Sequence, residues 1–196
     1  MATLSNSPLL IAIVGVNGAG KSTITARLRQ EPGFPANYVN PDEIALTLTD
    51  IADPIDRSYT AARKADEQRN IWLTDRQSMA FETVMSHPSK IEFMQSAKDA
   101  GYRIMLIFVG LSSPELSLQR VGQRVQSGGH NVPTDKIMAR YYRVMALLPN
   151  ALQVADRALI YDNSDDCAEA RLVLSFNDGR VGYRSSDLPE WLSFLI

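Results

Sequence analysis

The residues from 15 to 22 carry the clearest chemical signal in the chain. They read Gly15-Val16-Asn17-Gly18-Ala19-Gly20-Lys21-Ser22, which matches the G-x-x-x-x-G-K-S pattern of a phosphate-binding loop at every specified position. Glycine permits backbone conformations that turn successive N–H groups toward phosphate oxygens. The lysine carries a positive charge to the β- and γ-phosphates, and the serine hydroxyl after it is placed to bind Mg²⁺. The motif therefore predicts binding of ATP or GTP.

The segments on either side of this loop suit the motif. Pro8–Val14 is continuously apolar, which is typical of a strand buried on both faces, and Lys21–Gln30 has the pattern of a helix. A helix that starts at the lysine directs the positive end of its dipole at the same phosphates. The predicted nucleotide-binding residues are Gly15, Val16, Asn17, Gly18, Ala19, Gly20, Lys21, Ser22 and Thr23.

The rest of the sequence separates three classes of phosphate-loop protein. A GTPase requires an Asn-Lys-x-Asp guanine-binding loop, which the sequence lacks. An ABC-type ATPase requires a Leu-Ser-Gly-Gly-Gln signature and a strand that ends in Asp-Glu. Gln126–His130 and Ala158–Asp162 are similar to these, but Asn163 stands where the glutamate is needed. A small kinase requires a base for the acceptor hydroxyl, cations over the transferring phosphate and an acceptor pocket.

Asp42 is the candidate for the base. It follows the predicted strand Asn37–Asn40, and in a parallel sheet this topology puts the residue beside the phosphate loop. A carboxylate near the γ-phosphate is the usual base in phosphoryl transfer. The alternative role of Asp42 is to complement the dipole of the helix that Pro41 begins, and neighbouring Glu43 fills that role equally well.

Arginines on two neighbouring helices are the candidate cations. Arg120 and Arg124 lie one turn apart on one predicted helix, and Arg140 and Arg143 lie on the next, across a Gly-Gly loop. Two such helix ends resemble a lid, over about residues 120–143, that closes over phosphates and excludes water. We predict catalytic roles for Arg124 and Arg140, a nucleotide contact for Arg120 and a substrate contact for Arg143. The alternative for any one of them is a solvated basic face.

A glutamate near the end of a predicted buried strand completes the set. Glu82 belongs to the strand Met79–Val84, and an unpaired buried carboxylate is costly, so a partner is expected. It is a candidate to bind an acceptor hydroxyl or a magnesium-bound water. Because parallel strands share one carboxyl edge, the predicted substrate-side residues are Asn40, Asp42, Glu82, Thr83 and Arg143.

Apolar strands alternate with helices along the chain. Strands are predicted at 8–14, 37–40, 79–84, 102–110 and 157–161, and helices at 21–30, 54–76, 88–100, 114–126 and 134–155, with Asp53 as a helix cap. This alternation predicts an α/β fold, a three-layer doubly wound parallel sheet of the P-loop NTPase type, over about residues 8–163. Residues 164–196 are predicted to form a small β appendage with a turn at Asn177–Gly179.

The composition excludes several other classes. The length of 196 residues suits one domain, and 20 Lys+Arg against 22 Asp+Glu leave a net charge of −2, without the basic excess of a nucleic-acid-binding protein. The single cysteine, Cys167, excludes a disulfide framework or a cysteine-rich zinc site. The apolar run Leu9–Val14 is too short to span a bilayer, so we expect a cytoplasmic protein without a membrane partner. Trp72 and Trp191 are interpreted as packing residues.

The ordered set of motifs resembles the zeta toxin family of P-loop kinases, in particular its short bacterial branch. The resemblance rests on the phosphate loop with Thr23, and on Val39–Ala45, Phe81–Thr83, Phe108–Leu111, Arg124–Pro133 and Arg140–Arg143. It implies ATP- and Mg²⁺-dependent phosphorylation of a hydroxyl. Under this resemblance Asp42 corresponds to the catalytic base, Lys21 to the phosphate lysine, Arg124 and Arg140 to the phosphate-clamping arginines, and Glu82 to the substrate-side acid.

Well-known members of that family act on UDP-N-acetylglucosamine and are held inactive by an antitoxin. The resemblance therefore implies this acceptor and an antitoxin partner. The segment Thr47–Arg76, where a sugar-nucleotide pocket would be built, matches no motif. Two alternatives stay open: a kinase of another small hydroxyl compound (a nucleoside, a dinucleotide or an antibiotic), and an ABC-like, nucleotide-switched ATPase that acts through a protein partner.

Overall fold

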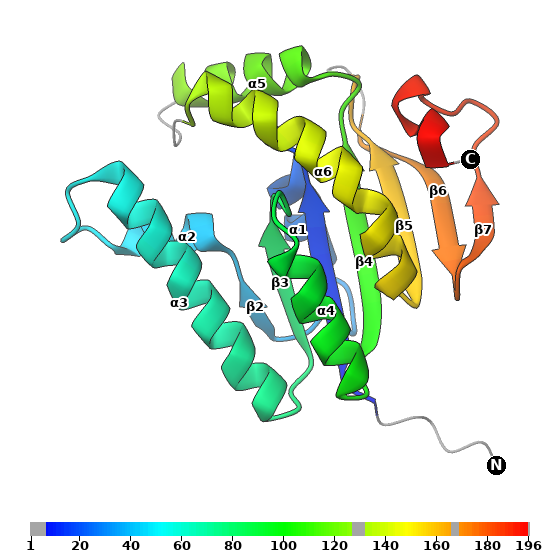
Figure 1. Ribbon diagram of the computed structural model, residues 1–196, viewed down its shortest axis with the longest axis horizontal. Helices are drawn as coiled ribbons and strands as arrows, with labels where there is room; N and C mark the ends of the chain where they lie inside the picture. Colours follow the sequence, from blue (N-terminus) through cyan, green and yellow to red (C-terminus); the bar gives the residue numbers. More distant parts are fainter. Residues whose placement is uncertain (1–6, 127–131, 166–168, 196) are drawn as a thin grey trace.

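The computed structural model describes residues 7–126, 132–165 and 169–195 (Figure 1). Within these ranges the strands form one sheet in the order β2-β3-β1-β4-β5-β6-β7. The strands are β1 (Leu9–Gly15), β2 (Asn37–Val39), β3 (Met79–Thr83), β4 (Arg103–Gly110), β5 (Arg157–Asp162), β6 (Arg171–Asn177) and β7 (Arg180–Arg184). The helices are α1 (Lys21–Leu28), α2 (Pro41–Thr47), α3 (Pro54–Thr74), α4 (Ser89–Asp99), α5 (Pro114–Gln126) and α6 (Thr134–Val154), with a 3-10 helix, η1 (Glu190–Leu195).

The predicted α/β class is confirmed, and the predicted elements match the observed ones to within a few residues at each end. Asp53 caps α3 as expected, because its Oδ1 accepts hydrogen bonds from the backbone N–H groups of Ile55 and Asp56, both at 2.8 Å. Ser127–Asn131, the middle of the predicted lid, and Cys167 lie outside the described residues. Among the helices that are described, none is long and apolar enough to cross a membrane.

Both faces of the parallel part of the sheet are buried, but under different cover. On β1, Leu10, Ala12 and Val14 belong to a larger core that includes buried residues of α4 and α6. The alternate residues Ile11 and Ile13 belong to a smaller core, against which α1 packs. Figure 1 shows α4 and α6 in front of the sheet and α1 behind it. This double cover explains why the strand is continuously apolar rather than alternating.

The C-terminal strands extend the same sheet. β2, β3, β1, β4 and β5 pair in parallel, whereas β6 pairs antiparallel with β5, and β7 pairs antiparallel with β6. The turn between β6 and β7 consists of Asp178 and Gly179, with positive φ angles of 49° and 73°. Positive φ at both central residues is what a tight type I′ hairpin requires. The predicted β appendage therefore continues the central sheet at its β5 edge, and its turn is where the sequence predicts it.

A substitution at Gly110 can test how tightly the C-terminal segment packs on this sheet. A Cβ atom at Gly110 would stand 2.3 Å from Cη2 of Trp191, which no real contact allows. We expect Gly110→Ala to lower the free energy of unfolding by about 1–3 kcal/mol, measured by urea denaturation, because the ring must move. The control is Gly122→Ala on α5, where a Cβ would meet nothing within 4 Å and alanine favours the helix. Equal midpoints for the two variants would contradict this packing.

Candidate functional site

A cleft of about 400 Å³ lies at the carboxyl ends of β1, β2 and β3. We call it the first cleft. It collects most of the residues that the sequence singles out, because parallel strands bring their following loops to one edge. Its lining includes Asn17, Gly18, Ala19, Gly20, Lys21, Ser22, Thr23, Asn40, Asp42, Glu82, Thr83, Arg120, Arg124 and Arg140.

The phosphate loop is held in a shape that only glycine permits at its start. A Cβ at Gly15 would stand 2.1 Å from the carbonyl oxygen of Val109 on the neighbouring strand. The carbonyl of Val16 accepts a hydrogen bond from Nζ of Lys21 at 3.0 Å. Neither Gly15 nor Val16, which are also predicted nucleotide-binding residues, lines the first cleft.

Glu82 is buried beneath the loop and is fully engaged. Only 4% of the residue is exposed. Its Oε1 accepts a hydrogen bond from Oγ of Ser22 at 2.8 Å, and its Oε2 accepts from Oγ1 of Thr25 at 2.8 Å and from the hydroxyl of Tyr38 at 3.3 Å. The expected partner of the buried carboxylate therefore exists. One of the three partners is the Ser22 hydroxyl, which the sequence predicts to bind Mg²⁺.

Charged side chains of both signs surround Lys21 in the first cleft. Burial is the largest effect on its ammonium group and lowers its pKa. The carboxylates of Glu82 and Asp42 raise that pKa, and the guanidinium groups of Arg124 and Arg140 lower it. The five side chains come from five different elements or loops, and each charge is close enough to act on the lysine.

Asn40 and Asp42 begin α2 at the mouth of the cleft. The Oδ1 of Asn40, which is buried, accepts a hydrogen bond from the backbone N–H of Asp42 at 2.9 Å and so caps the helix. Asp42 itself is exposed, whereas Oε1 of Glu43 lies 3.9 Å from Nη1 of Arg29. The cap holds the backbone of Asp42, the residue that the sequence predicts as base.

Three of the four predicted arginines line the first cleft. Arg120 also donates from Nη1 to the carbonyl of Asn163 at 2.6 Å, which fixes α5 beside the loop. Arg143 is the exception: it is exposed, its Nε donates to the carbonyl of Ala139 at 3.2 Å, and it is absent from the cleft lining. Its side chain runs along its own helix, so the predicted substrate contact of Arg143 is not supported.

A second cleft, of about 520 Å³, lies on the other side of the loop. It shares Gly18, Gly20, Thr23 and Arg120 with the first cleft. The second cleft is further lined by Ile24, Arg27, Leu28, Gln123, Tyr161, Asn163, Asp165, Glu169 and Ala170. The phosphate loop therefore separates two hollows.

A basic cluster that the sequence did not predict lies at the α4 end of the first cleft. Nζ of Lys90, which lines this cleft, donates to Oδ1 of Asp66 at 2.7 Å, and the same oxygen accepts from Nη2 of Arg69. Two cations share one carboxylate, so the cluster keeps an excess of positive charge. Arg69 is buried and stacks on Phe81 and Phe93, at 4.8 and 5.1 Å from the ring centroids. Lys90 follows β3, so the strand-end rule could have found it, whereas Asp66 and Arg69 lie within α3 and give no local signal.

The loop, the two clefts and the parallel sheet define a P-loop nucleotide-binding protein of the kinase type. The chain belongs to the zeta toxin family: the family model, described as Zeta toxin, matches residues 2–169. The resemblance inferred from the motifs is thereby confirmed, and the family assigns the chain to the P-loop kinases as a class.

The chain is similar to one relative by sequence and to two solved structures by fold. A protein of Haemophilus influenzae Rd, described only as uncharacterized, is 29% identical over 127 residues, which are 65% of this chain and 88% of that protein. The AvrRxo1-ORF1:-ORF2 complex with ATP contains a chain with a TM-score of 0.71 and 18% identity; 91% of this chain covers 61% of that one. The PezAT toxin-antitoxin system of Streptococcus pneumoniae gives a TM-score of 0.60 and 18% identity, over 86% of this chain and 72% of that one. The present chain thus spans about three fifths of the AvrRxo1-ORF1 neighbour.

The hydrogen bonds to Glu82 generate a stability prediction. Thr25→Val removes one hydroxyl donor from a buried carboxylate and keeps the shape of the side chain. We expect the free energy of unfolding to fall by about 1.5–3 kcal/mol, as for loss of a hydrogen bond to a charged group, measured by urea denaturation. The control is Thr74→Val, because the hydroxyl of Thr74 donates only to the carbonyl of Asn70 in its own helix. A loss no larger than that of the control would show that Glu82 does not need this donor.

Proposed function

We propose that this protein is a zeta-toxin-like kinase that transfers the γ-phosphate of ATP to a hydroxyl group of a small molecule, with UDP-N-acetylglucosamine as the acceptor. The observation that carries the proposal is the convergence of charges around Lys21. A partly buried phosphate-loop lysine, an exposed carboxylate and two arginines share one cleft. This is the set of groups that phosphoryl transfer to a hydroxyl requires.

The two clefts suggest how the substrates divide. The triphosphate would lie over the loop residues that both clefts share, with the nucleoside in the second cleft and the acceptor in the first. The backbone N–H groups of the loop and the N-terminus of α1 bind phosphate oxygens without any change of charge in the protein. Arg120, which the carbonyl of Asn163 holds in place, adds a cation at the boundary of the two clefts.

The residues present suit a bound Mg²⁺ ion. Ser22 and Glu82 would hold it, directly or through water, and Mg²⁺ prefers such oxygen ligands and retains several waters. Among the described residues no group of three or more histidine, cysteine, aspartate or glutamate side chains forms a metal site, so phosphate oxygens would complete the shell. When bound, the ion neutralises negative charge on the phosphates.

The residues of the first cleft account for the transfer step. Asp42 accepts the proton of the acceptor hydroxyl as the hydroxyl oxygen forms its bond to the γ-phosphorus. The bond from that phosphorus to the bridging oxygen breaks, and ADP leaves. Lys21, Arg124 and Arg140 stabilise the charge that spreads over the transferring group, where a cleft partly shielded from water makes each cation more effective.

The far end of the first cleft supports an anionic acceptor. Lys90 has N–H donors beyond the one used by Asp66, and the Lys90–Asp66–Arg69 cluster carries an excess positive charge. The diphosphate of UDP-N-acetylglucosamine would complement this charge. Nucleotides and dinucleotides share that chemistry, so they are the alternative acceptors that the same cluster would favour.

The ABC-like alternative has less support. The strand that resembles its catalytic strand is β5, which ends at Asp162. The Asp162 carboxylate accepts hydrogen bonds from Trp191 and Ser164, whereas the Ser22 hydroxyl is bonded to Glu82. The acid beside the phosphate loop therefore comes from β3. An antitoxin partner is proposed from the family and from the PezAT system, which is itself a toxin-antitoxin pair.

Acceptor-dependent ATP consumption is the test of this function. We expect the protein with ATP and Mg²⁺ to consume ATP faster when UDP-N-acetylglucosamine is present, and mass spectrometry to show one added phosphate on the sugar nucleotide. Lys21→Ala should lose both signals, because the phosphates lose the cation that the loop supplies. ATP turnover that ignores every hydroxyl acceptor tried would refute the kinase proposal, and turnover with a different acceptor would refute only the choice of sugar nucleotide.

Asp42 and Glu43 form a matched pair for the base. Asp42→Asn should lower kcat by about 10²–10⁴-fold, the usual contribution of a general base, while the Kd for ATP changes little. Glu43→Gln changes the same charge at the next position, outside the first cleft, and should retain nearly full activity. If the two variants had similar activities, Asp42 would be only a helix-terminal charge.

Arg140 and Arg143 form a second pair, one helical turn apart. We expect Arg140→Ala to lower the rate of transfer by about 10³-fold or more, because a positioned arginine stabilises the transferring phosphoryl group. Arg143→Ala should leave the rate nearly unchanged, because its side chain lies along α6. Steady-state kinetics at saturating ATP measures both, and a larger effect at Arg143 would reverse the assignment made from the cleft.

A further inference from the structure

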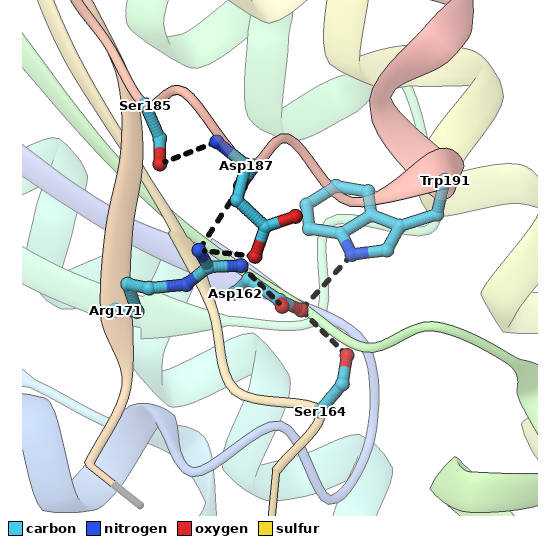
Figure 2. Close-up of polar contacts among 6 residues, drawn as sticks. All are labelled: Asp162, Ser164, Arg171, Ser185, Asp187 and Trp191. Carbon is cyan, nitrogen blue, oxygen red and sulfur yellow. Dashed lines mark hydrogen bonds and ion pairs between the residues drawn. The ribbon is translucent and has the colours of Figure 1, made fainter.

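The C-terminal strands and η1 lie beyond residue 169, where the match to the zeta toxin family model ends. They nevertheless return to the carboxyl edge of the sheet, close to the phosphate loop. Figure 2 shows the polar contacts at this place, where the side chains of Arg171, Trp191 and Ser164 surround the carboxylate of Asp162 at the end of β5.

Asp162 is the centre of these contacts. Its side chain is only 12% exposed. Its Oδ1 accepts hydrogen bonds from Nε1 of Trp191 at 3.0 Å and from Oγ of Ser164 at 2.5 Å, and its Oδ2 lies 3.8 Å from Nη2 of Arg171. Arg171 is held in turn by Asp187, whose Oδ2 and backbone carbonyl both accept from Nη1 at 3.0 Å (Figure 2). The C-terminal segment therefore supplies two of the three donors or cations around this carboxylate.

The ring of Trp191 packs against the backbone at Gly110. Three of its carbon atoms would lie 2.3–2.8 Å from a Cβ at Gly110, so the indole occupies the space that the missing side chain leaves. The ring also packs against Phe108, with centroids 6.0 Å apart. This seat directs the indole N–H at Asp162.

Asn163 stands between the two residues that this cluster holds, Asp162 and Ser164. Its backbone N–H donates to the carbonyl of Gly110 at 3.1 Å, and its side-chain Nδ2 donates to the carbonyl of Ala19 in the phosphate loop at 2.9 Å. Its own carbonyl accepts from Arg120 at 2.6 Å. Asn163 thus contacts the loop and an arginine of the predicted nucleotide site, and it lines the second cleft.

We propose that the C-terminal segment, residues 171–195, positions Asn163 for nucleotide binding, and that Trp191 and Asp162 are positioning residues for the phosphate loop. The inference rests on the proposed binding of ATP at that loop. Trp191 fixes Asp162, the β5 end fixes Asn163, and Asn163 fixes the carbonyl of Ala19 and the guanidinium of Arg120. Loss of the Trp191 contact therefore weakens the hold on Asn163 and lowers the affinity for the nucleotide. The acceptor side of the site, formed by β2, β3 and α4, stays unchanged.

The test compares nucleotide and acceptor affinities in full-length variants. Trp191→Phe removes the N–H donor together with the far indole carbons that lie over Gly110. We expect the Kd for ATP, measured by calorimetry, to rise about 5- to 10-fold, because Asp162 loses one of its hydrogen bonds. The KM for the acceptor should stay within twofold. The control is Phe194→Ala on the same 3-10 helix, because Phe194 is half exposed and outside the cluster.

A second readout stays available if Trp191→Phe folds poorly. Trp72→Phe leaves Trp191 as the one tryptophan in the chain, since the sequence contains 2. ATP added to this variant should change the fluorescence of Trp191, and UDP-N-acetylglucosamine alone should not.

The outcomes separate the two proposals. An unchanged Kd for ATP in Trp191→Phe, with no ATP-dependent fluorescence from Trp191, overturns the positioning role while the kinase proposal stands. An equal rise in the Kd for ATP in Phe194→Ala also overturns it, because the effect would then be general loosening of the segment. If the unaltered protein does not bind ATP, the proposed function fails and this inference fails with it.

Discussion

A carboxylate buried beneath a phosphate loop is the constraint on which this structure depends. A carboxyl group in a 4% exposed position, such as that of Glu82, is tolerable only if hydrogen-bond donors surround it, and those donors are hydroxyl groups of α1 and β2. The same contacts therefore tie β3 to the start of α1 and to the neighbouring strand. They also place the Ser22 hydroxyl and an acid side by side under the loop. Stability and the candidate chemistry of the loop rest on one set of hydrogen bonds.

The order of the strands determines which charges meet at Lys21. Because β1 lies between β3 and β4, the loops after all three strands open at one edge, and α5 starts next to the phosphate loop. Ser117 on α5 donates to the carbonyl of Asn17 in the loop at 2.5 Å, and Arg120 follows one turn later. Acidic groups reach Lys21 from the β2 and β3 side, and arginines reach it from α5 and α6. The order of the strands thus separates the proposed base from the proposed phosphate clamp.

The C-terminal hairpin gives the sheet an asymmetric shape. It converts β5 from an edge strand into an internal one, so the edge of the sheet moves to β7, where all five residues are exposed. The short arm between β7 and the end of η1 then folds back over the strand ends, where Leu192 is buried in the main core. An extension that looks peripheral in the sequence therefore borders the same edge as the phosphate loop.

Contiguous patterns in the sequence determined the features that depend on local backbone geometry. The phosphate loop, the apolar β1 strand, the Asp53 cap and the Asp178–Gly179 turn each follow from residues within a few positions of one another. The position of Asp42 was also predictable from the local sequence, because the residue follows directly after a strand end. Tertiary structure alone decided the three donors of Glu82, the Lys90–Asp66–Arg69 cluster and the contact of Asn163 with Ala19. It also decided that Arg140 lines the first cleft and that Arg143, one turn further along the same helix, does not. Each of these contacts joins residues that are distant in the sequence. Strand order and helix orientation bring such residues together, and local spacing in the sequence does not encode either.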